Sequence, residues 1–503
     1  MQSTKLLLAI AIPTGRSFSL LAARRYTPRL FNKQQRRMGQ GIAVEDGYIL
    51  NKNPATGELI SKVPVTKNVD ELVLQSQKGF YSWSNTVGVS DRIEMLKKGL
   101  KEMQAQSEHA TKMITQEMGK PIAEAIEEFE GATNKDEYFQ ILHDSLQPII
   151  HGSSTVIRQA LGVVVILSPW NYPADEILLL ALPALAAGNV VIVKPSEVTP
   201  ETGRFLVDCL AKHLPPGVLQ LAQGDGAVGA ELIQHSAVKM VCMTGSSATG
   251  KHILSSVAPQ MKRCVLELGG KDPMVVFDSA DVDQAARDAV TYSLSNSGQV
   301  CCSIERIYVA DSIYDNFCKL VTEKYAPTFK VGNGMEKDTK VGPMVSEFQR
   351  SHVEAHVKDA LKKGATLLYQ STVPDNAPAG SSFYPVTVLS NLKKGMRVYD
   401  EETFGPVVSI TSFSGSEEDA VKLVNDDSPY GLASAVYTQD GESAQRVASQ
   451  IQAGQVGINC YAMEHMNVAC PWVGHKESGF GFHSGQEGFN NFSLPKTIVR
   501  VPK

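Results

Sequence analysis

The chain has 503 residues, a net charge of −5 and 43% hydrophobic residues, a composition typical of a globular protein with large buried cores. This length predicts two or three domains, and the mildly acidic balance excludes a typical nucleic-acid-binding surface. The 8 cysteines form no C-x-x-C pair and lie near no histidine cluster, so we expect neither a metal site nor a disulfide framework.

The first 40 residues differ from this average, because they are rich in arginine and contain no Asp or Glu. This pattern is typical of an organelle transit peptide over 1–40, and "LAARRYTPR" resembles a mitochondrial processing site. The pattern favours the mitochondrial matrix, with a plastid as the alternative. A secretory signal after Lys5 is the rival, but its apolar run is short and ends at Pro13. No other run approaches the roughly 20 apolar residues of a membrane span, so we expect no membrane association.

Short strands and then amphipathic helices are predicted at the start of the folded region. "YILNKNPATGELISKVPV" indicates strands joined by turns, and the apolar spacing predicts helices over 69–85 and 90–120. Ser90 is the expected N-cap of the second helix.

A regular alternation of strands and helices follows, beginning with the continuous apolar run "GVVVILS". Strand-like runs over 189–197, 217–223, 238–247 and 262–270 are separated by helix-like segments. This alternation predicts a parallel α/β sheet with right-handed crossovers. A second α/β region runs from "DPMVVFDSAD" to about residue 465, and the boundary is expected near Gly269 and Gly270.

Two glycine-containing turns are candidates for contact with a dinucleotide. "GDGAVG" (Gly224 to Gly229) matches G-x-G-x-x-G after a strand, but a plain βα turn explains it equally well. "TGSSATG" joins a strand to a helix and offers amides and hydroxyls to a phosphate, although N-capping alone accounts for Ser246 or Ser247.

Polar residues at strand ends are the candidates for chemistry. Glu197 in "VKPSE" can accept hydrogen bonds from a ribose and would repel a 2′-phosphate; the alternative is a solvated turn. Glu267 in "LELGGK" suits a general base, and Asn171 in "SPWNYP" suits an oxyanion donor, each beside a purely structural alternative. "GQVCC" places two thiols in one loop, where a reactive thiolate and a small buried hydrophobe are both open interpretations.

Eight motifs, taken in order, resemble the aldehyde dehydrogenase superfamily. They are "PWNYP", "KPSEVTP", "TGSSATG", "LELGGK", "NSGQVCCSIER", "EETFGPV", "GINCY" and "SGFG". The resemblance covers the chain after about residue 45. It implies an α/β aldehyde dehydrogenase-like fold with a Rossmann-like cofactor domain, an α/β catalytic domain and a small β oligomerisation arm. The expected boundaries are 42–147 with 162–268 for the NAD-binding domain, 269–465 for the catalytic domain, and 148–161 with 488–503 for the arm.

The resemblance implies three catalytic residues. The family nucleophile is the second residue after "GQ", with an Arg five residues later, which is Cys301 here. The general base corresponds to Glu267, and the oxyanion donors correspond to Asn171 and the backbone N–H of Cys301. Cys302 then occupies a variable position. We nevertheless state the hypothesis that oxidation joins the two adjacent thiols or caps the nucleophile, and so makes activity redox-sensitive.

The resemblance also implies the cofactor, which is NAD with NADP as the alternative. Lys194 and Glu197 correspond to contacts with the adenosine ribose, and Glu402 and Phe404 to contacts with the nicotinamide ribose. The stretch from Gly245 to Gly250 would lie along the pyrophosphate. Contact of Gly224 and Gly229 with the dinucleotide is therefore less expected. The predicted cofactor set is Ser168, Trp170, Lys194, Glu197, Gly245, Ser246, Gly250, Glu402 and Phe404.

The implied reaction oxidises an aldehyde to an acid through a thiohemiacetal and a thioester on Cys301. The presence of Glu267 favours hydrolysis of the thioester. The expected partners are a small-molecule aldehyde and further copies of the chain, as a homodimer or homotetramer. An NADP-preferring or semialdehyde-specific enzyme, or a non-catalytic use of the fold, are the alternatives.

Some positions depart from the family pattern. The usual "PFGG" is "PWVG" (Pro471 to Gly474), and the usual Arg-Glu after "SGFG" is Phe482-His483. We expect these changes to affect the substrate mouth and the assembly and to leave the reaction unchanged. Acids at Asp175, Glu176 and Glu464 are expected near the tunnel mouth, where they would favour aminoaldehydes or neutral aldehydes; solvent-facing side chains are the alternative.

Overall fold

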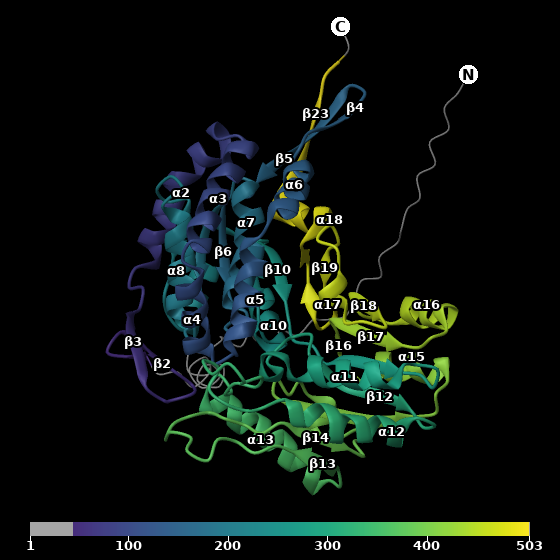
Figure 1. The fold of residues 1–503 in the computed structure, drawn as a ribbon. Coiled ribbons are helices and arrows are strands. Elements are labelled where there is room, and N and C mark those ends of the chain that lie inside the picture. Colours follow the sequence, from purple (N-terminus) through teal and green to yellow (C-terminus); the bar gives the residue numbers. More distant parts are fainter. Residues whose placement is uncertain (1–43, 502–503) are drawn as a thin grey trace, which may run out of the picture. The chain divides into compact units, whose positions relative to one another are not determined.

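Strands and helices alternate along the computed structural model, which describes residues 44–501 (Figure 1). The predicted transit peptide over 1–40 lies outside the described residues. The N-terminal elements are β1 (Val44–Glu45), β2 (Tyr48–Lys52), β3 (Leu59–Pro64), α2 (Val69–Thr86), α3 (Val89–Gln104), α4 (Ser107–Met118), α5 (Ile122–Thr133) and α6 (Asp136–Ser145). The helix predicted over 90–120 is therefore two helices. Its first half is capped by Gly88 and not by Ser90, whose hydroxyl lies 3.3 Å from the His143 ring.

The first large sheet has the order β21-β10-β9-β6-β7-β8. Its five parallel strands are β6 (Val163–Leu167), β7 (Val190–Lys194), β8 (Leu219–Leu221), β9 (Val238–Thr244) and β10 (Arg263–Glu267). The connecting helices are α7 (Pro173–Ala186), α8 (Pro200–Ala211), α9 (Gly226–Gln234) and α10 (Ser247–Val257). Every residue of β7 is buried, as the apolar run predicts for a strand that is covered on both faces.

The second large sheet has the order β13-β14-β15-β12-β11-β17-β18. Only β13 runs antiparallel to its neighbour among the described pairings of this sheet. Its strands are β11 (Asp272–Val276), β12 (Ile304–Ala310), β13 (Thr366–Gln370), β14 (Thr387–Ser390), β15 (Val407–Phe413), β17 (Ala433–Tyr437) and β18 (Gln455–Ile458). The helices of this region are α11 (Val282–Leu294), α12 (Tyr314–Lys319), α13 (Glu347–Lys362), α14 (Arg397–Asp400), α15 (Glu417–Asp426), α16 (Gly441–Gln450) and α17 (Ala462–His465).

A third sheet joins segments from distant parts of the chain, in the order β23-β5-β4. Its antiparallel strands are β4 (Ile149–His151), β5 (Ser154–Ala160) and β23 (Ser493–Val499). They project from the rest of the described residues, with blue and yellow strands side by side (Figure 1). This pairing agrees with the predicted arm.

The segment between the second sheet and β23 forms short strands beside β10 (Figure 1). These strands are β19 (Trp472–Val473), β20 (His475–Lys476), β21 (Gly479–Phe480) and β22 (Phe482–His483), and the helix α18 (Gly485–Phe489) follows them. Strand β20 pairs antiparallel with β16 (Tyr430–Gly431), which precedes β17 in the chain. Strand β21 runs antiparallel to β10 and pairs Glu267 with Gly479. The C-terminal segment therefore meets the first sheet at the predicted general base.

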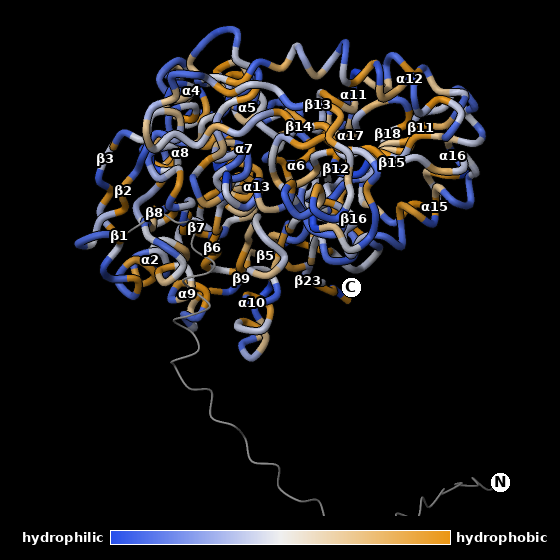
Figure 2. The backbone as a smooth tube through the Cα atoms, turned by 90° about the horizontal axis from the view of Figure 1, so that it is seen from below, coloured by the Kyte–Doolittle hydropathy of each residue, from blue (hydrophilic) through white to orange (hydrophobic). Residues whose placement is uncertain are grey.

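Hydrophobic residues are concentrated along the inner strands, whereas outer helices such as α15 alternate between hydrophilic and hydrophobic residues (Figure 2). The largest apolar cluster includes β6, β7 and most of α7, which is buried nearly all round. None of the helices within residues 44–501 is both long and apolar enough to cross a membrane.

Candidate active site

The loop that carries Cys301 has an unusual backbone. Asn296, Ser297 and Gly298 all have positive φ angles, of 50°, 59° and 72°. A Cβ atom on Gly298 would lie 2.1 Å from the Gly405 carbonyl oxygen, so the close approach of these two loops requires glycine. Non-glycine residues hold this conformation only when their surroundings enforce it, and such strain concentrates at functional sites.

The Cys301 thiol lies against the predicted general base. Its Sγ is 3.7 Å from Oε1 of Glu267, and the Cys301 residue is partly buried. Hydrogen bonding to the Cys302 thiol, followed by burial, raises the pKa of Cys301 above its usual value. Glu267 is the carboxylate placed to take the proton of this thiol.

Glu267 is held by two side chains that the sequence interpretation did not assign to the site. The indole N–H of Trp472 donates to Oε1 at 2.7 Å, and His483 Nε2 lies 2.8 Å from Oε2. Both belong to the departures from the family pattern. The structure places both departures against the predicted general base, because β21 pairs with β10 and β22 pairs with β19. Their expected effect on substrate and assembly stays a prediction.

Asn171 lies next to the Cys301 loop, as its predicted role requires. Its side-chain amide donates to the Gln299 carbonyl at 3.1 Å. Asn296 donates to the carbonyls of both Asn171 and Gln299, at 3.0 and 3.1 Å, and so ties the two segments together. Asn296 was missed as a positioning residue, and its place in "NSGQVCC" was the only available signal.

The predicted ribose contacts meet at the carboxyl end of β7. Lys194 Nζ lies 3.6 Å from a Glu197 oxygen, and both side chains are largely buried. The Ser168 N–H lies at the end of the neighbouring β6 and donates to the Lys194 carbonyl. A Cβ atom added to Gly229 would lie 3.6 Å from Cδ of Lys194. These residues share one edge of the parallel sheet, where α/β folds bind dinucleotides.

The predicted pyrophosphate segment is the β9–α10 turn. Ser246 caps α10 by accepting a hydrogen bond from the Thr249 N–H, and the Gly245 N–H donates to the Glu267 carbonyl. A Cβ on Gly250 would lie 2.5 Å from Leu268, so this glycine serves helix–sheet packing. The free amides of an 11-residue helix N-terminus suit a pyrophosphate.

The "EETFGPV" loop reaches the end of β10. Glu402 Oε1 accepts from the Gly270 N–H at 3.0 Å, and burial, followed by the charge of Glu305, raises its pKa to about 8. Phe404 has a φ of 52° and meets the Trp170 ring edge to face at 5.4 Å. The buried Lys271–Glu305 ion pair supports this loop, because Glu305 also accepts the backbone N–H groups of Thr403 and Phe404.

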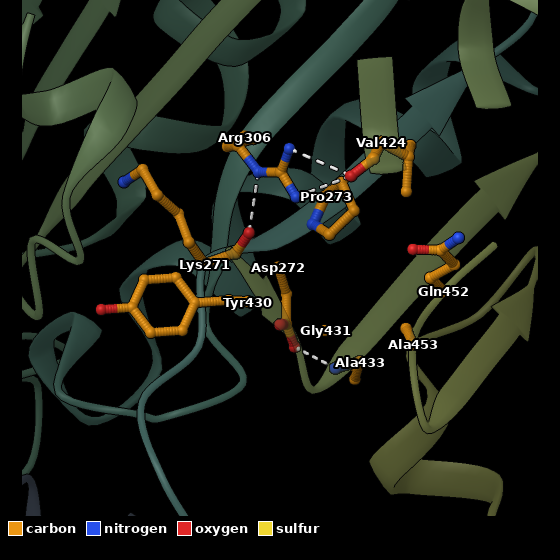
Figure 3. Close-up of a pocket in the computed structure, with 10 residues that line it drawn as sticks. All are labelled: Lys271, Asp272, Pro273, Arg306, Val424, Tyr430, Gly431, Ala433, Gln452 and Ala453. Atoms are coloured by element: carbon orange, nitrogen blue, oxygen red, sulfur yellow. Dashed lines mark hydrogen bonds between the residues drawn. The ribbon is translucent and has the colours of Figure 1, made fainter. Parts of the chain in front are cut away.

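Arg306, the marker residue after the cysteines, has a supporting position. Figure 3 shows a small pocket in which its Nε donates to the Lys271 carbonyl at 2.8 Å. In the same pocket Asp272 accepts the Ala433 N–H at 3.0 Å. None of the described residues that line this pocket is a predicted site residue, so the pocket is not the active site. Its two hydrogen bonds hold in place the chain that follows "LELGGK".

Cys302 has other partners than Glu267. It is 1% exposed, and its Sγ contacts the Tyr461 hydroxyl at 3.1 Å and the Met463 thioether. The Tyr461 hydroxyl also donates to the Cys302 carbonyl at 2.9 Å. The two adjacent cysteines thus have different surroundings, and only Cys301 meets the carboxylate.

The three acids expected near the tunnel mouth lie in different places. Glu176 is buried, accepts from the Thr244 hydroxyl at 2.8 Å, and has a pKa raised by burial and then by the charge of Glu267. It therefore lies beside the general base and not at a solvent-exposed mouth. Asp175 lies 3.4 Å from the Lys135 ammonium group, which offsets its charge. Glu464 accepts from the Tyr292 hydroxyl at 2.5 Å at an exposed position.

Within the described part of the chain, no three His, Cys, Asp or Glu side chains are arranged to hold a metal ion. The candidate active site is therefore built from a thiol, a carboxylate, two donors to that carboxylate, and a sheet edge suited to a dinucleotide.

Comparison with known proteins identifies the family. The aldehyde dehydrogenase family model matches residues 43–498. The chain belongs to the aldehyde dehydrogenase family. It is an oxidoreductase that converts aldehydes to acids with a nicotinamide dinucleotide.

Its relatives in this family differ in the substrates that they are named for. The chain is 34% identical to the mitochondrial succinate-semialdehyde dehydrogenase of Oryza sativa subsp. japonica, covering 92% of this chain and 88% of the relative. It is 35% identical to the betaine aldehyde dehydrogenase of Bacillus subtilis (strain 168), covering 92% and 96%. The crystal structure of betaine aldehyde dehydrogenase from Staphylococcus aureus in complex with NAD+ has a TM-score of 0.84 and 31% identity, covering 92% and 93%.

Proposed function

We propose that this aldehyde dehydrogenase uses NAD and that Cys301 is its nucleophile. The observation that carries the proposal is the pair formed by the Cys301 thiol and the Glu267 carboxylate, 3.7 Å apart in a partly buried site. Lone cysteines are usually inert, but a thiol beside a base is the arrangement of nucleophilic catalysis.

In the acylation half, Glu267 takes the thiol proton and Sγ of Cys301 bonds to the aldehyde carbon. The oxyanion that forms is stabilised by the Asn171 side-chain amide and the Cys301 backbone N–H, each contributing roughly 3–4 kcal/mol by analogy with other oxyanion sites. Asn171 is held for this role by Gln299 and Asn296. A bound nicotinamide would supply the acceptor for the hydride that leaves the thiohemiacetal carbon as its oxyanion re-forms C=O and gives the thioester.

Before deacylation, Glu267 releases the thiol proton to solvent, and the carboxylate that results acts as the base for water. The water oxygen bonds to the thioester carbon, one water proton goes to Glu267, and the carbon–sulfur bond breaks to release the acid and the Cys301 thiolate. The Trp472 and His483 contacts keep the carboxylate next to the sulfur through this step.

The residues at the carboxyl ends of β6, β7 and β9 fit a dinucleotide. Lys194 and Glu197 would bind the adenosine ribose, Ser246 and the start of α10 the pyrophosphate, and Glu402 the nicotinamide ribose. The Glu197 carboxylate would repel a 2′-phosphate, which supports NAD over NADP.

The substrate is inferred to be a neutral or cationic aldehyde. Glu464 is exposed beside Tyr292, and Tyr292 stacks on Tyr461 at 4.3 Å, so the side chains around Cys302 are acidic and aromatic. An acidic entrance disfavours anionic aldehydes. Turnover of succinate semialdehyde and of an aminoaldehyde by the wild type and Glu464→Gln tests this. A preference of the wild type for the anion contradicts the inference.

The same proposal covers assembly, domains and location. The β4–β5–β23 arm leaves Ile150 74% and Val499 66% exposed, which supports pairing between subunits in a homodimer or homotetramer. The two large sheets support the domain boundary near Gly269. The composition of 1–40 supports import into mitochondria, with plastids as the alternative.

The test is turnover by the chain without residues 1–40. Reduced cofactor is followed with NAD or NADP and a panel of aliphatic, aromatic, amino- and semialdehydes, beside Cys301→Ala. We expect faster turnover with NAD and none in the variant. Equal turnover in Cys301→Ala would refute the nucleophile, and faster turnover with NADP would refute the cofactor assignment.

A further inference from the structure

The Glu267 carboxylate is clamped by two side chains that face each other across a short ladder. Strands β19 and β22 pair antiparallel, and Trp472 is the direct register partner of His483. Trp472 donates to one carboxylate oxygen at 2.7 Å and His483 contacts the other at 2.8 Å. Trp472 is 8% exposed, His483 3% and Glu267 5%, so the clamp is nearly dry.

Backbone pairing fixes this clamp over the base. Strand β21 lies between β19 and β22 in the sequence, and its Gly479 pairs with Glu267 on β10. The Gly481 position has a φ of 73° and lies close to the Cys264 carbonyl, which lets the chain turn from β21 into β22. Trp472 and His483 thus lie on one β ribbon, formed by strands β19 to β22, and its strand β21 forms the edge of the first large sheet.

The proton on the His483 ring can be assigned from its partners. A carboxylate only accepts hydrogen bonds, so the ring nitrogen facing Glu267 carries the hydrogen and donates it. His483 Nδ1 lies 2.8 Å from the Ser484 hydroxyl, and Ser484 has a φ of 62°. In neutral His483 this hydroxyl donates to Nδ1 and holds the ring in the tautomer that donates to Glu267.

The neighbours of Glu267 make such a clamp necessary. The Cys301 thiol lies 3.7 Å from Oε1, the oxygen that also accepts the Trp472 N–H, and the buried Glu176 accepts from the hydroxyl of Thr244, the strand partner of Glu267. The two donors each occupy one oxygen and restrict the rotation of the carboxylate, because a buried carboxylate needs partners for its oxygen atoms.

We propose that His483 is a positioning residue for thioester hydrolysis, acting through Glu267. The inference rests on the proposed function. In the step concerned, a water oxygen bonds to the thioester carbon, one water proton passes to Glu267, and the carbon–sulfur bond breaks with its electron pair on Cys301. His483 holds the carboxylate that receives the proton. Acylation also uses Glu267 as a base, but there its partner is the Cys301 thiol, which the protein itself holds 3.7 Å from Oε1, whereas a water molecule is not held by the chain; acylation is therefore expected to be less sensitive.

The experiment separates the two halves of the reaction in rapid-mixing measurements of reduced cofactor. The variants are His483→Leu, which removes the donor, and His483→Gln, whose amide N–H can reach the same carboxylate oxygen. His475→Leu is the matched control, because His475 lies exposed on β20 of the same ribbon. Thermal unfolding of each purified variant checks the fold.

We expect His483→Leu to form reduced cofactor in a burst of about one per site and then to turn over about 10- to 100-fold more slowly than the wild type. His483→Gln should recover to within a few-fold, and His475→Leu should match the wild type. Where His483→Leu does not fold, the inference is tested by the ratio of burst amplitude to steady-state turnover rate in His483→Gln and Trp472→Phe.

Three results would overturn the inference: wild-type steady-state turnover in His483→Leu, loss of the burst with a normal unfolding midpoint, or no recovery in folded His483→Gln. Failure of the proposed function gives a different pattern, because Cys301→Ala would then turn over aldehyde whatever stands at position 483.

Discussion

The buried Lys271–Glu305 pair gives the sharpest stability prediction. Lys271 Nζ lies 2.6 Å from Glu305 Oε2, and the two side chains are 0% and 5% exposed. Glu305 also accepts the N–H groups of Thr403 and Phe404, so it fixes the loop that carries Glu402. Lys271→Met fills a similar volume but leaves a buried carboxylate without its cation, which costs about 3–5 kcal/mol.

The matched control is Lys251→Met. Lys251 lies 2.7 Å from Glu477, but these side chains are 60% and 44% exposed, so the pair contributes only about 0–1 kcal/mol. The assay is urea unfolding at one fixed protein concentration, because assembly affects apparent stability. We also expect Lys271→Met to raise the KM for NAD, and Lys271→Met with Glu305→Gln to recover part of the stability. Equal losses in Lys271→Met and Lys251→Met would refute the reasoning.

Three further predictions follow from single residues. The pKa of Glu402 is about 8 in the folded protein against an ordinary 4.5, so its contribution to stability falls as pH rises from about 4.5 to 8; unfolding midpoints across this window should be flatter in Glu402→Gln. Gly298→Ala should cost about 1–3 kcal/mol in thermal unfolding and reduce turnover, whereas Gly441→Ala, with open space around it, should not. Peroxide inactivation should be reversed by reductant in the wild type but not in Cys302→Ser; equal reversal in both would exclude Cys302 as the resolving thiol.

Much of the first large sheet could be predicted from the sequence because its strands are covered on both faces. Runs such as "GVVVILS" and "NVVIVK" are continuous and apolar, and the structure has strands β6 and β7 there. Local capping was also readable, since Ser246 does cap α10. The break between α3 and α4 was missed, because apolar spacing continues across Ala105 and Gln106.

The clamp on Glu267 was beyond sequence reasoning. Trp472 and His483 lie 205 and 216 residues from Glu267 in the chain. Strands of two residues leave no periodic signal, and only the pairing of β21 with β10 brings them together. Their unusual identities were visible in the sequence, but their partner was not.

The most direct test of the central claim is to locate the acyl group on the enzyme. Enzyme mixed with aldehyde and NAD is quenched in acid, digested, and analysed by peptide mass spectrometry. We predict a thioester mass on the peptide that contains Cys301, on the first of its two adjacent cysteines, with higher occupancy in His483→Leu. An acyl group on Cys302 or on another residue, or steady turnover with no acyl-enzyme in either protein, would contradict the account.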